Sequence, residues 1–499
     1  MSMKTLVHSS MLRGVDIVVS LAAVLFCFAC SGSNEQFLVP RKPVPLTVKP
    51  VRISGDVPTG ENLLWIVIDT LRADRLGCYG YRRNTTPEID RIAAEGIRFE
   101  RFYAASPWTA PSFGTMFTGV SPAVHKTGRM VREKPAAGGK QSKKGLRPIN
   151  ANIRTVAELL EKRDSAGFFT NLYLQESLGF HRGFDHFDVE RGTLLGARRA
   201  DKVVSAALKW LGKKRQRPFM TVVHFMDPHT AYDPLPKYRR LFLKGDAPTE
   251  FVKAPFAPKG RVMRRGYSPS AAERRYIMGL YNGELRHVDT HIGRLIRTMA
   301  TRGMLDKTWV IITADHGEEH YDHGGFNHGY QFEDEVTRVP LIIRAPGAWG
   351  GGTLVDTAAR HVDLLPTVLE WFDIPAPRYL EGKSLMPILR GEETRHRPAY
   401  MEFPIVKEDA YAYFDGRYKL IKNVTSKLRY MYDLHTDPLE RHKLHTPHKR
   451  LDAVEAEMAA YRTARKGLID AVDKGKMQTK AARLSDEEQR ILENLGYIE

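Results

Sequence analysis

One stretch of the sequence joins a buried-strand pattern to side chains that bind metals. Residues 309–313 are apolar or β-branched, which indicates a buried strand. Asp315 and His316 follow, and an Asp–His pair is a common ligand set for a divalent metal ion. Further histidines come next: His320, His323 and His328. The stretch predicts metal chemistry at a strand end, with His320 and His323 favoured as structural residues of a folded loop.

Two other apolar runs also end in a carboxylate. Residues 63–68 lead into Asp69, and residues 219–226 lead into Asp227, with His229 just beyond. Sites in open α/β sheets form outside the carboxyl ends of the strands. The three strand ends together therefore predict one site rich in carboxylate and imidazole, although any one aspartate alone would serve equally well in a turn or a helix cap.

Thr109 is the candidate nucleophile. Pro111 suits the first turn of a helix, so Thr109 is expected at or near the helix N-terminus. The positive end of the helix dipole lies there, and anions bind there. Taken alone, an ordinary helix N-cap is the better interpretation of this threonine.

Composition narrows the class of protein. The chain has 499 residues, of which 42% are hydrophobic and 10% aromatic, as in folded proteins. Its formal net charge of +18 is compatible with anionic substrates, with an anionic membrane surface, or with solubility alone. The charge is spread along the chain and no nucleic-acid motif is evident, so we expect no nucleic-acid partner.

The N-terminus has the pattern of an export signal. Residues 1–30 comprise a basic start, an apolar run and a small residue before Cys30. This pattern resembles a bacterial lipoprotein signal, with lipidated Cys30 holding the protein on the periplasmic face of the outer membrane or on the cell surface. An ordinary cleaved signal or a retained anchor are the alternatives. The mature chain would keep only Cys30 and Cys78, so no disulfide framework is expected. Residues 31–60 are Pro-rich and predict a tether.

The rest of the chain falls into two regions with different patterns of apolar residues. Residues 61–390 alternate apolar runs with amphipathic segments, so we expect an α/β domain there. Within residues 391–499 we expect a small antiparallel sheet, since short strand-like runs flank the hairpin signal at 415–416. Helices are expected over 447–472 and from a capping box at Ser485. Residues 132–150 are basic and Gly-rich, and a solvated loop is favoured over a binding element.

Several motifs in order resemble the sulfatase family of the alkaline phosphatase superfamily. They are Asp-x-Leu-Arg-x-Asp-x-Leu-Gly-Cys-Tyr-Gly at 69–80, x-Pro-Ser-x-x-x-x-x-Thr-Gly at 110–119, His-Phe-Met-Asp-Pro-His at 224–229, Ala-Asp-His-Gly-Glu at 314–318, Arg-Val-Pro-Leu-Ile-Ile-x-x-Pro-Gly at 338–347 and Tyr-Asp-Leu-x-x-Asp-Pro-x-Glu at 432–440. The resemblance implies an alkaline phosphatase-like, mostly parallel central sheet flanked by helices, with a small C-terminal antiparallel sheet.

The departures from the family pattern concern the nucleophile and its surroundings. Sulfatases carry Cys or Ser where this chain has Thr109, and convert it to formylglycine. The arginine that steadies formylglycine is replaced by Phe113. The sulfate-gripping Lys-x-His segment is not evident near residues 167–171. A threonine with an Asp–His metal pair instead resembles the phosphoglycerol and phosphoethanolamine transferases of the same superfamily.

The comparison and the residue chemistry together define a candidate site. The expected ligands of one divalent metal ion are Asp69, Thr109, Asp315 and His316, whose single nitrogen favours Mn or Zn and leaves Mg and Ca open. Three further histidines are candidates to hold the substrate oxyanion or protonate the leaving group, or else to be structural imidazoles: His125, His229 and His328.

We therefore expect a metal-dependent hydrolase or transferase that acts on phosphate, phosphonate or sulfate esters of glycans, lipids or small molecules. Thr109 would be its nucleophile. A sulfatase that works without formylglycine is the first alternative. A catalytically inactive, sulfatase-like protein that binds anions at the cell surface is the second.

Overall fold

The computed structural model describes residues 41–132, 144–190, 198–244, 268–403, 410–445, 448–474 and 482–483. The expected signal peptide, Cys30 and the helix expected from Ser485 lie outside these residues. Within the described ranges, no helix is both long and apolar enough to cross a bilayer.

A mixed sheet forms the centre of the fold. Its strand order is β12-β2-β11-β8-β1-β7-β5-β6, with β13 also pairing with β2. The strands are β1 (Asn62–Ile68), β2 (Ile97–Tyr103), β5 (Asp164–Phe169), β6 (His186–Val189), β7 (Phe219–Phe225), β8 (Thr308–Thr313), β11 (Arg338–Arg344), β12 (Thr353–Val355) and β13 (Ala359–Arg360). The pairs β8–β1, β1–β7, β7–β5 and β5–β6 are parallel, whereas β11 runs antiparallel to both β8 and β2. The predicted mostly parallel α/β sheet is confirmed.

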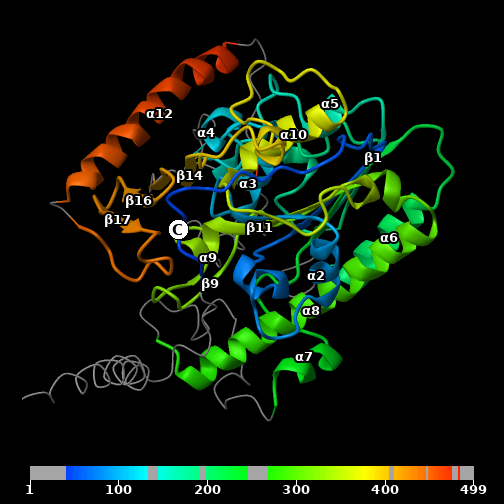
Figure 1. The fold of residues 1–499 in the computed structure, drawn as a ribbon, viewed down its shortest axis with the longest axis horizontal. Helices are drawn as coiled ribbons and strands as arrows, with labels where there is room; N and C mark the ends of the chain where they lie inside the picture. The colour runs from blue at the N-terminus through cyan, green and yellow to red at the C-terminus, as the bar shows by residue number, and fades with distance from the viewer. Residues whose placement is uncertain are drawn as a thin grey trace, which may run out of the picture.

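Helices cover both faces of this sheet (Figure 1). One group is α2 (Pro87–Ala94), α6 (Ala200–Leu211), α7 (Pro236–Phe242) and α8 (Ala271–Thr301). The other is α3 (Thr109–Thr118), α4 (Pro122–His125), α5 (Val156–Leu159) and α10 (Leu364–Trp371). Helix α8 is one continuous helix and begins at a capping box formed by Ser270 and Glu273, which satisfies backbone N–H groups of its first turn.

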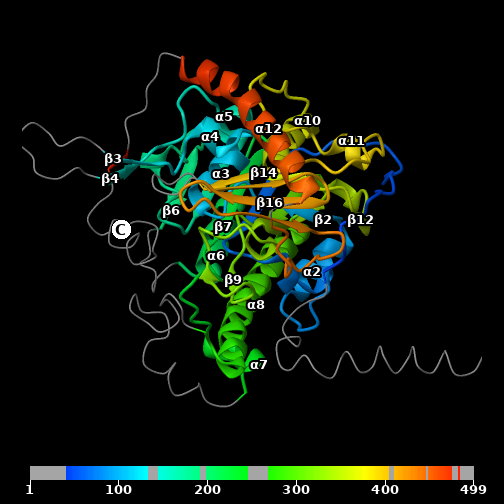
Figure 2. The same ribbon diagram turned by 90° about the vertical axis from the view of Figure 1, so that its left-hand side faces the viewer.

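The C-terminal region adds a four-stranded antiparallel sheet, as expected. Its strands are β14 (Ala399–Phe403), β15 (Ala410–Phe414), β16 (Tyr418–Asn423) and β17 (Arg429–Asp433). Alternate residues face opposite sides. Ala410, Ala412 and Phe414 join the main core, whereas Tyr411 and Tyr413 pack with residues of α12 (Lys449–Asp473). Helix α12 therefore covers the outer face of this sheet (Figure 2).

Short elements complete the described chain. They are η2 (Ala73–Arg75), η3 (Gly77–Tyr79), β3 (Met130–Arg132), β4 (Lys144–Leu146), η4 (Glu176–Leu178), η6 (Leu305–Lys307), β9 (Glu319–His320), β10 (Phe326–Asn327), α9 (Asp334–Thr337), η7 (Pro346–Ala348), η8 (His361–Asp363), α11 (Met386–Leu389) and β18 (Ala482–Arg483). Strands β3 and β4 pair with each other on either side of residues 133–143, the part of the basic 132–150 insertion that lies outside the described residues.

Residues 41–60, the described part of the expected 31–60 tether, pack against the domain. Val44 is buried, and its N–H donates to the carbonyl of Leu434. Arg41 forms buried ion pairs with Glu335 and Glu440. Residues 41–60 therefore form a strap rather than a free tether. Local composition could not reveal this, because the partners lie about three hundred to four hundred residues further along the chain.

Candidate active site

The fold brings the main predicted site residues to one edge of the sheet. Strands β1 and β8 are neighbours and parallel, with Val67 opposite Thr313, so the residues that follow them share this edge. Asp69 follows β1, and Asp315 and His316 follow β8. Thr109 is the first residue of α3, and its side chain is buried with theirs.

Distances show that these side chains converge. Ligand atoms of Asp69, Asp315 and His316 all lie within 4.8 Å of one another. His316 Nε2 lies 3.8 Å from Asp69 Oδ1 and 3.5 Å from Asp315 Oδ2. The same nitrogen lies 3.3 Å from Thr109 Oγ1. The four predicted metal-site residues therefore surround one point.

The chemistry of these donors fits a divalent cation. His316 Nδ1 lies 2.9 Å from the carbonyl oxygen of Gly317, which can only accept, so the ring proton sits on Nδ1 and the Nε2 lone pair faces the carboxylates. Asp69 Oδ1 and Asp315 Oδ2 are buried and have no hydrogen-bond partner among the described residues. Burial, and then the charge of Asp69, raise the pKa of Asp315 well above its usual range. A cation at this point would relieve that repulsion.

Asn171 and His224 belong to this site but were missed as site residues from the sequence. The Asn171 amide donates to Asp69 Oδ2 at 2.8 Å and to Thr109 Oγ1 at 3.4 Å. His224 Nδ1 accepts from the N–H of Thr170, which leaves the ring proton on Nε2, 3.3 Å from Asp69 Oδ2. Burial opposes ionisation of Asp69, but the hydrogen bond from His224 and the other histidine side chains nearby outweigh it and lower the pKa of Asp69. Asn171 comes just after β5, so the strand-end rule could have found it.

His229 and His328 lie beside the metal-type cluster. Their rings are 4.9 Å apart, and the His328 ring is 4.3 Å from that of His316. His229 Nδ1 donates to the carbonyl of Thr230 at 2.5 Å. His328 Nδ1 lies 2.8 Å from Glu318 Oε1, and Glu318 Oε2 accepts from the hydroxyls of Thr230 and Tyr232. Glu318, which the sequence did not single out, therefore orients His328.

The structure places His125 differently from the other two histidines. Its Nδ1 accepts from the N–H of Thr127, and its Nε2 lies 3.1 Å from both the Pro111 carbonyl and Thr115 Oγ1. Burial lowers the pKa of His125 to about 3, so the ring is neutral. Both ring nitrogens thus serve the packing of α3 and its neighbouring loop.

Asp227 does not join the cluster, contrary to the expectation that three strand-end carboxylates converge. Its Oδ2 accepts from the N–H of Ala200 at the start of α6 and lies 3.9 Å from His287 Nδ1. A helix N-terminus attracts carboxylates, so Asp227 follows the capping alternative.

The loop after His316 is held by backbone hydrogen bonds to residues of α9. The N–H groups of Gly317 and Glu318 donate to the carbonyls of Val336 and Glu335. A Cβ at position 317 would lie 2.0 Å from the Glu335 oxygen, so only glycine permits this approach. His320 contacts Tyr232 and Arg72, and His323 contacts Glu335, in agreement with structural roles.

A second group of metal-type side chains lies nearby. Ligand atoms of His323, Glu335 and Glu440 also lie within 4.8 Å of one another. Arg41 pairs with both glutamates, and Lys419 Nζ lies 2.6 Å from Glu440 Oε1 and 2.6 Å from Asp334 Oδ1. Burial raises the pKa of Glu440 to about 8, although the positive charge of Lys419 opposes this shift. Basic side chains and a proton thus neutralise this group.

Comparisons with known proteins agree with the fold. The family model described as sulfatase matches residues 61–374, and the model described as N-sulphoglucosamine sulphohydrolase, C-terminal, matches residues 321–464. Uncharacterized sulfatase YidJ of Escherichia coli is 27% identical over 420 residues, which cover 77% of this chain and 82% of that protein. The N-acetylglucosamine-6-O-sulfatase of Bacteroides thetaiotaomicron is 25% identical over 483 residues, covering 77% of this chain and 82% of that protein.

The fold is also similar to solved structures. The phosphonate monoester hydrolase of Agrobacterium radiobacter superposes with a TM-score of 0.64 at 20% identity, over 82% of this chain and 96% of that chain. The family model covers more than half of the sequence, and the related enzymes are ester hydrolases. The chain belongs to the sulfatase family, whose members are metal-dependent ester hydrolases.

Proposed function

We propose that this protein is a metal-dependent hydrolase or transferase of phosphodiesters or phosphonate monoesters, with Thr109 as its nucleophile. The observation that carries the proposal is the position of Thr109 Oγ1. It lies 3.3 Å from His316 Nε2, at the start of α3, beside two buried carboxylates. Asp69, Asp315 and His316 would hold the cation together with Thr109. When bound, the cation would lower the pKa of the Thr109 hydroxyl and neutralise an oxygen of the ester.

The surrounding residues support attack by Thr109. The Asn171 amide donates to Thr109 Oγ1 and to Asp69, so it fixes the distance between the nucleophile and that carboxylate. The hydroxyl proton passes to solvent, and Oγ1 forms a bond to phosphorus while the bond from phosphorus to the leaving oxygen breaks. The N-terminus of α3 favours negative charge at the attacked group.

His229 is the proposed proton donor to the leaving oxygen. Its Nδ1 donates to the Thr230 carbonyl, so Nε2 is the nitrogen that exchanges protons with the substrate. His229 gives a proton to the leaving alcohol and takes one from the water or acceptor alcohol that then attacks phosphorus and releases Thr109. His328, held by Glu318, packs between His229 and His316 and positions the first of these rings. His125 is not assigned a catalytic role.

Two features favour phosphorus over sulfur as the reaction centre. A threonine ester cannot collapse to an aldehyde, which is how formylglycine releases sulfate, so water or an alcohol must displace Thr109 at the same centre. Phe113 stands where the family has an arginine and packs edge-on against His224, with ring centroids 5.3 Å apart. Among the described residues, no lysine or arginine is ion-paired to Asp69 or Asp315. A site with few basic side chains suits a diester, which carries a single negative charge.

Sulfate ester hydrolysis is the alternative function. It is favoured by the relatives, which include an N-acetylglucosamine-6-O-sulfatase, and by the family model itself. In that case Thr109 would bind the metal ion, and a metal-activated water would attack the sulfate ester.

Kinetics on matched aryl phosphodiester, phosphonate and sulfate esters separate these functions. We expect the first two to exceed the sulfate ester in kcat/KM, and Thr109→Ala to abolish turnover of all three. Thr118→Ala is the matched control, because Thr118 is an equally buried threonine of α3 whose hydroxyl donates, among the described residues, only to the Gly114 carbonyl. Dominant sulfate turnover, or turnover that survives in Thr109→Ala, would reject the proposed nucleophile.

We also propose that the protein is exported and carries lipid on Cys30, which would hold it at a membrane surface. The support is the sequence pattern of residues 1–30. Cys30→Ser should move the protein from the membrane fraction to the soluble fraction, with signal processing checked by mass spectrometry of the N-terminus. Wild-type protein that lacks lipid and is already soluble would contradict the assignment.

A further inference from the structure

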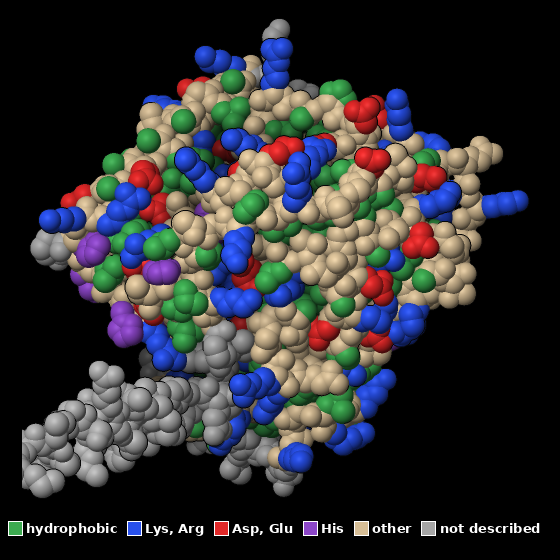
Figure 3. Space-filling view, viewed as in Figure 1, with side chains coloured by type: hydrophobic (Ala, Val, Ile, Leu, Met, Phe, Trp, Pro, Cys, Tyr) green, Lys and Arg blue, Asp and Glu red, His purple; other side chains and the backbone are tan. Residues whose placement is uncertain are grey.

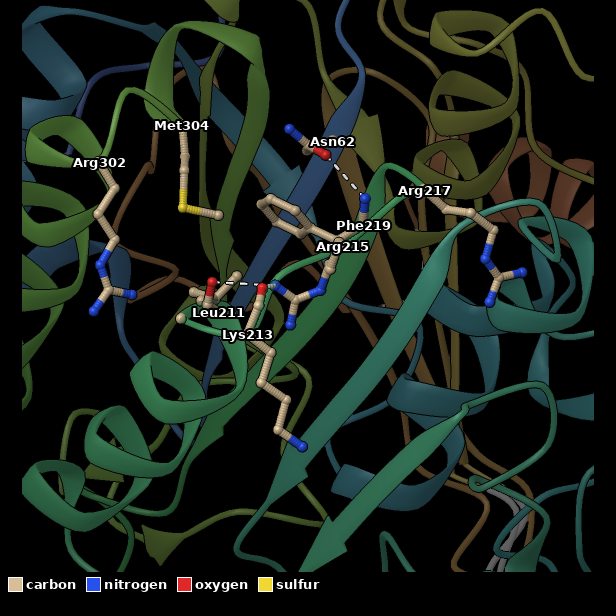
Figure 4. Close-up of a pocket in the computed structure, with 9 residues that line it drawn as sticks. Asn62, Leu211, Lys213, Arg215, Arg217, Phe219, Arg302 and Met304 are labelled. Atoms are coloured by element: carbon tan, nitrogen blue, oxygen red, sulfur yellow. Dashed lines mark hydrogen bonds between the residues drawn. The ribbon is translucent and has the colours of Figure 1, made fainter.

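A cavity of about 420 Å³ lies at the edge of the sheet opposite the catalytic cluster. It is lined by Asn62 and Phe219, which begin β1 and β7, and by residues at the ends of α6 and α8 (Figure 4). The catalytic residues follow the other ends of these strands. Seven residues of β1 span roughly 20 Å at the usual rise of a strand, so the cavity is separate from the proposed active site.

The cavity is strongly basic. Four cationic side chains line it, from the loop between α6 and β7 and from the end of α8: Lys213, Arg215, Arg217 and Arg302. Its lining contains no carboxylate. Asp164 lies 2.7 Å from Arg217 and 3.9 Å from Arg215, and the carbonyl ends of the two helices add partial negative charge. Asp185 Oδ2 also lies 3.6 Å from the Arg217 guanidinium. Two carboxylates and two half-charges therefore face four cations, so a positive excess of about one charge remains. Lys and Arg side chains are also widely spread over the face in Figure 3, but here they surround a hollow.

Arg215 is held in place before any ligand binds. Its guanidinium lies 3.8 Å from the centre of the Trp210 ring and donates to the carbonyls of Leu211 and Lys213, each at 3.1 Å. Arg302 donates to the carbonyl of Leu208 at 3.2 Å. Burial lowers the pKa of Arg215 although Asp164 opposes the shift, so the existing acid does not compensate this cation fully. Fixed cations lose little entropy on binding an anion, which favours affinity.

The size and lining indicate the chemical class of the ligand. The volume is in the range of small-molecule sites and exceeds that of one tetrahedral ion. Phe219, Leu211 and Met304 supply apolar surface between the cations. We propose that this cavity is a non-catalytic binding site for a small organic molecule, up to about disaccharide size, that carries a sulfate or phosphate ester. Guanidinium and ammonium groups bind the oxyanion, and the apolar side chains contact the carbon skeleton.

Calorimetric titration of the full chain tests the proposal. The probes are glucose 6-sulfate, glucose 6-phosphate and, as a neutral control, glucose, in a Thr109→Ala background so that no probe is hydrolysed. We expect an anionic probe to bind and glucose not to bind, with the tighter anion identifying the ester. The pair Lys213→Glu and Arg302→Glu should weaken this binding by about tenfold or more, because like charges then face the oxyanion.

The matched control is the pair Lys209→Glu and Lys214→Glu, which changes the net charge equally on exposed lysines outside the cavity. It should leave the affinity within about twofold. In the Thr109-containing protein, neither pair should change kcat/KM for the aryl ester. Equal weakening by both pairs, or no anion binding that depends on Lys213 and Arg302, would overturn the proposal. Neither result bears on the proposed nucleophile, which is tested by turnover.

Discussion

Two groups in this protein, one buried and one largely buried, share the same kinds of metal ligand, two carboxylates and one imidazole, but have opposite electrostatics. Asp69, Asp315 and His316 form one, and Glu335, Glu440 and His323 form the other. In the first, the carboxylates meet only histidines and amide donors, and two of their oxygens have no partner among the described residues. In the second, Arg41 and Lys419 pair with the carboxylates.

The comparison shows that convergence of ligands is not enough to identify a metal site. A buried carboxylate needs a cation, and the protein can supply its own. Only the group without basic side chains leaves that requirement to an ion from solution. Thr109 lies beside that group, so the carboxylates that lack a basic partner and the candidate nucleophile are at the same place in the fold.

The largest expected effect is the loss of catalysis in the first group. Asp315→Asn should lower kcat/KM roughly a thousandfold, because a metal ligand is lost next to the nucleophile. Without metal, the free energy of unfolding of this variant should be no lower than that of the wild type, because the repulsion between residue 315 and Asp69 disappears. Steady-state kinetics and urea unfolding in chelator measure both quantities. A fall in stability without a fall in activity would reverse the roles of the two groups.

Breaking the second group should mainly affect stability. Glu335→Gln leaves Arg41 partly unpaired in the interior, and the free energy of unfolding should fall by about 3–5 kcal/mol. Denaturant unfolding provides the measurement. Glu161→Gln is the control, because Glu161 is 72% exposed and should change the stability by less than about 0.5 kcal/mol. If the free energy of unfolding is unchanged in Glu335→Gln, the ion pair between the strap residue Arg41 and Glu335 does not stabilise the fold.

Metal binding should distinguish the groups directly. Adding Mn²⁺ or Zn²⁺ to chelated wild-type protein at 100 times the dissociation constant should raise the free energy of unfolding by about 2.7 kcal/mol. The same increment should appear in Glu335→Gln and vanish in Asp315→Asn. Elemental analysis of the purified proteins gives the bound metal. Retention of the increment in Asp315→Asn would place the ion elsewhere.

The remaining contrast between the two groups concerns pH. Burial opposes protonation of His323, but the charge of Glu335 and their hydrogen bond outweigh it and raise the pKa of His323 from 6.5 to about 10. The stabilisation is fully present below pH 6.5 and is lost as pH rises through about 10. The difference in unfolding free energy between wild type and His323→Gln should shrink across this window. His181→Gln, at an exposed histidine, should show no such trend.

Much of the catalytic cluster could be predicted because it follows a topological rule. Strands β1 and β8 carry apolar runs that end in Asp69 and Asp315, and parallel neighbours bring such ends together. The same rule failed for Asp227, because a helix N-terminus competed for its carboxylate. Sequence spacing cannot decide between these two uses, since both place an aspartate after a strand.

The compensation of charge could not be predicted. Arg41 lies in a Pro-rich segment with no strand or helix pattern, and its partner Glu335 is 294 residues away. Lys419 lies within β16 of the C-terminal sheet, where alternation alone would only assign it to one face. Such pairs depend on how distant parts of the chain dock, and that information is not local.

Gly317 sets a limit on engineering this enzyme. Its carbonyl fixes the proton of His316, and its own Cβ position is filled by the Glu335 oxygen. Any side chain there would have to push the loop outward and would turn the imidazole with it. A library intended to change substrate preference by randomising residues 317–329 would therefore lose most members at its first position, unless that position is kept as glycine.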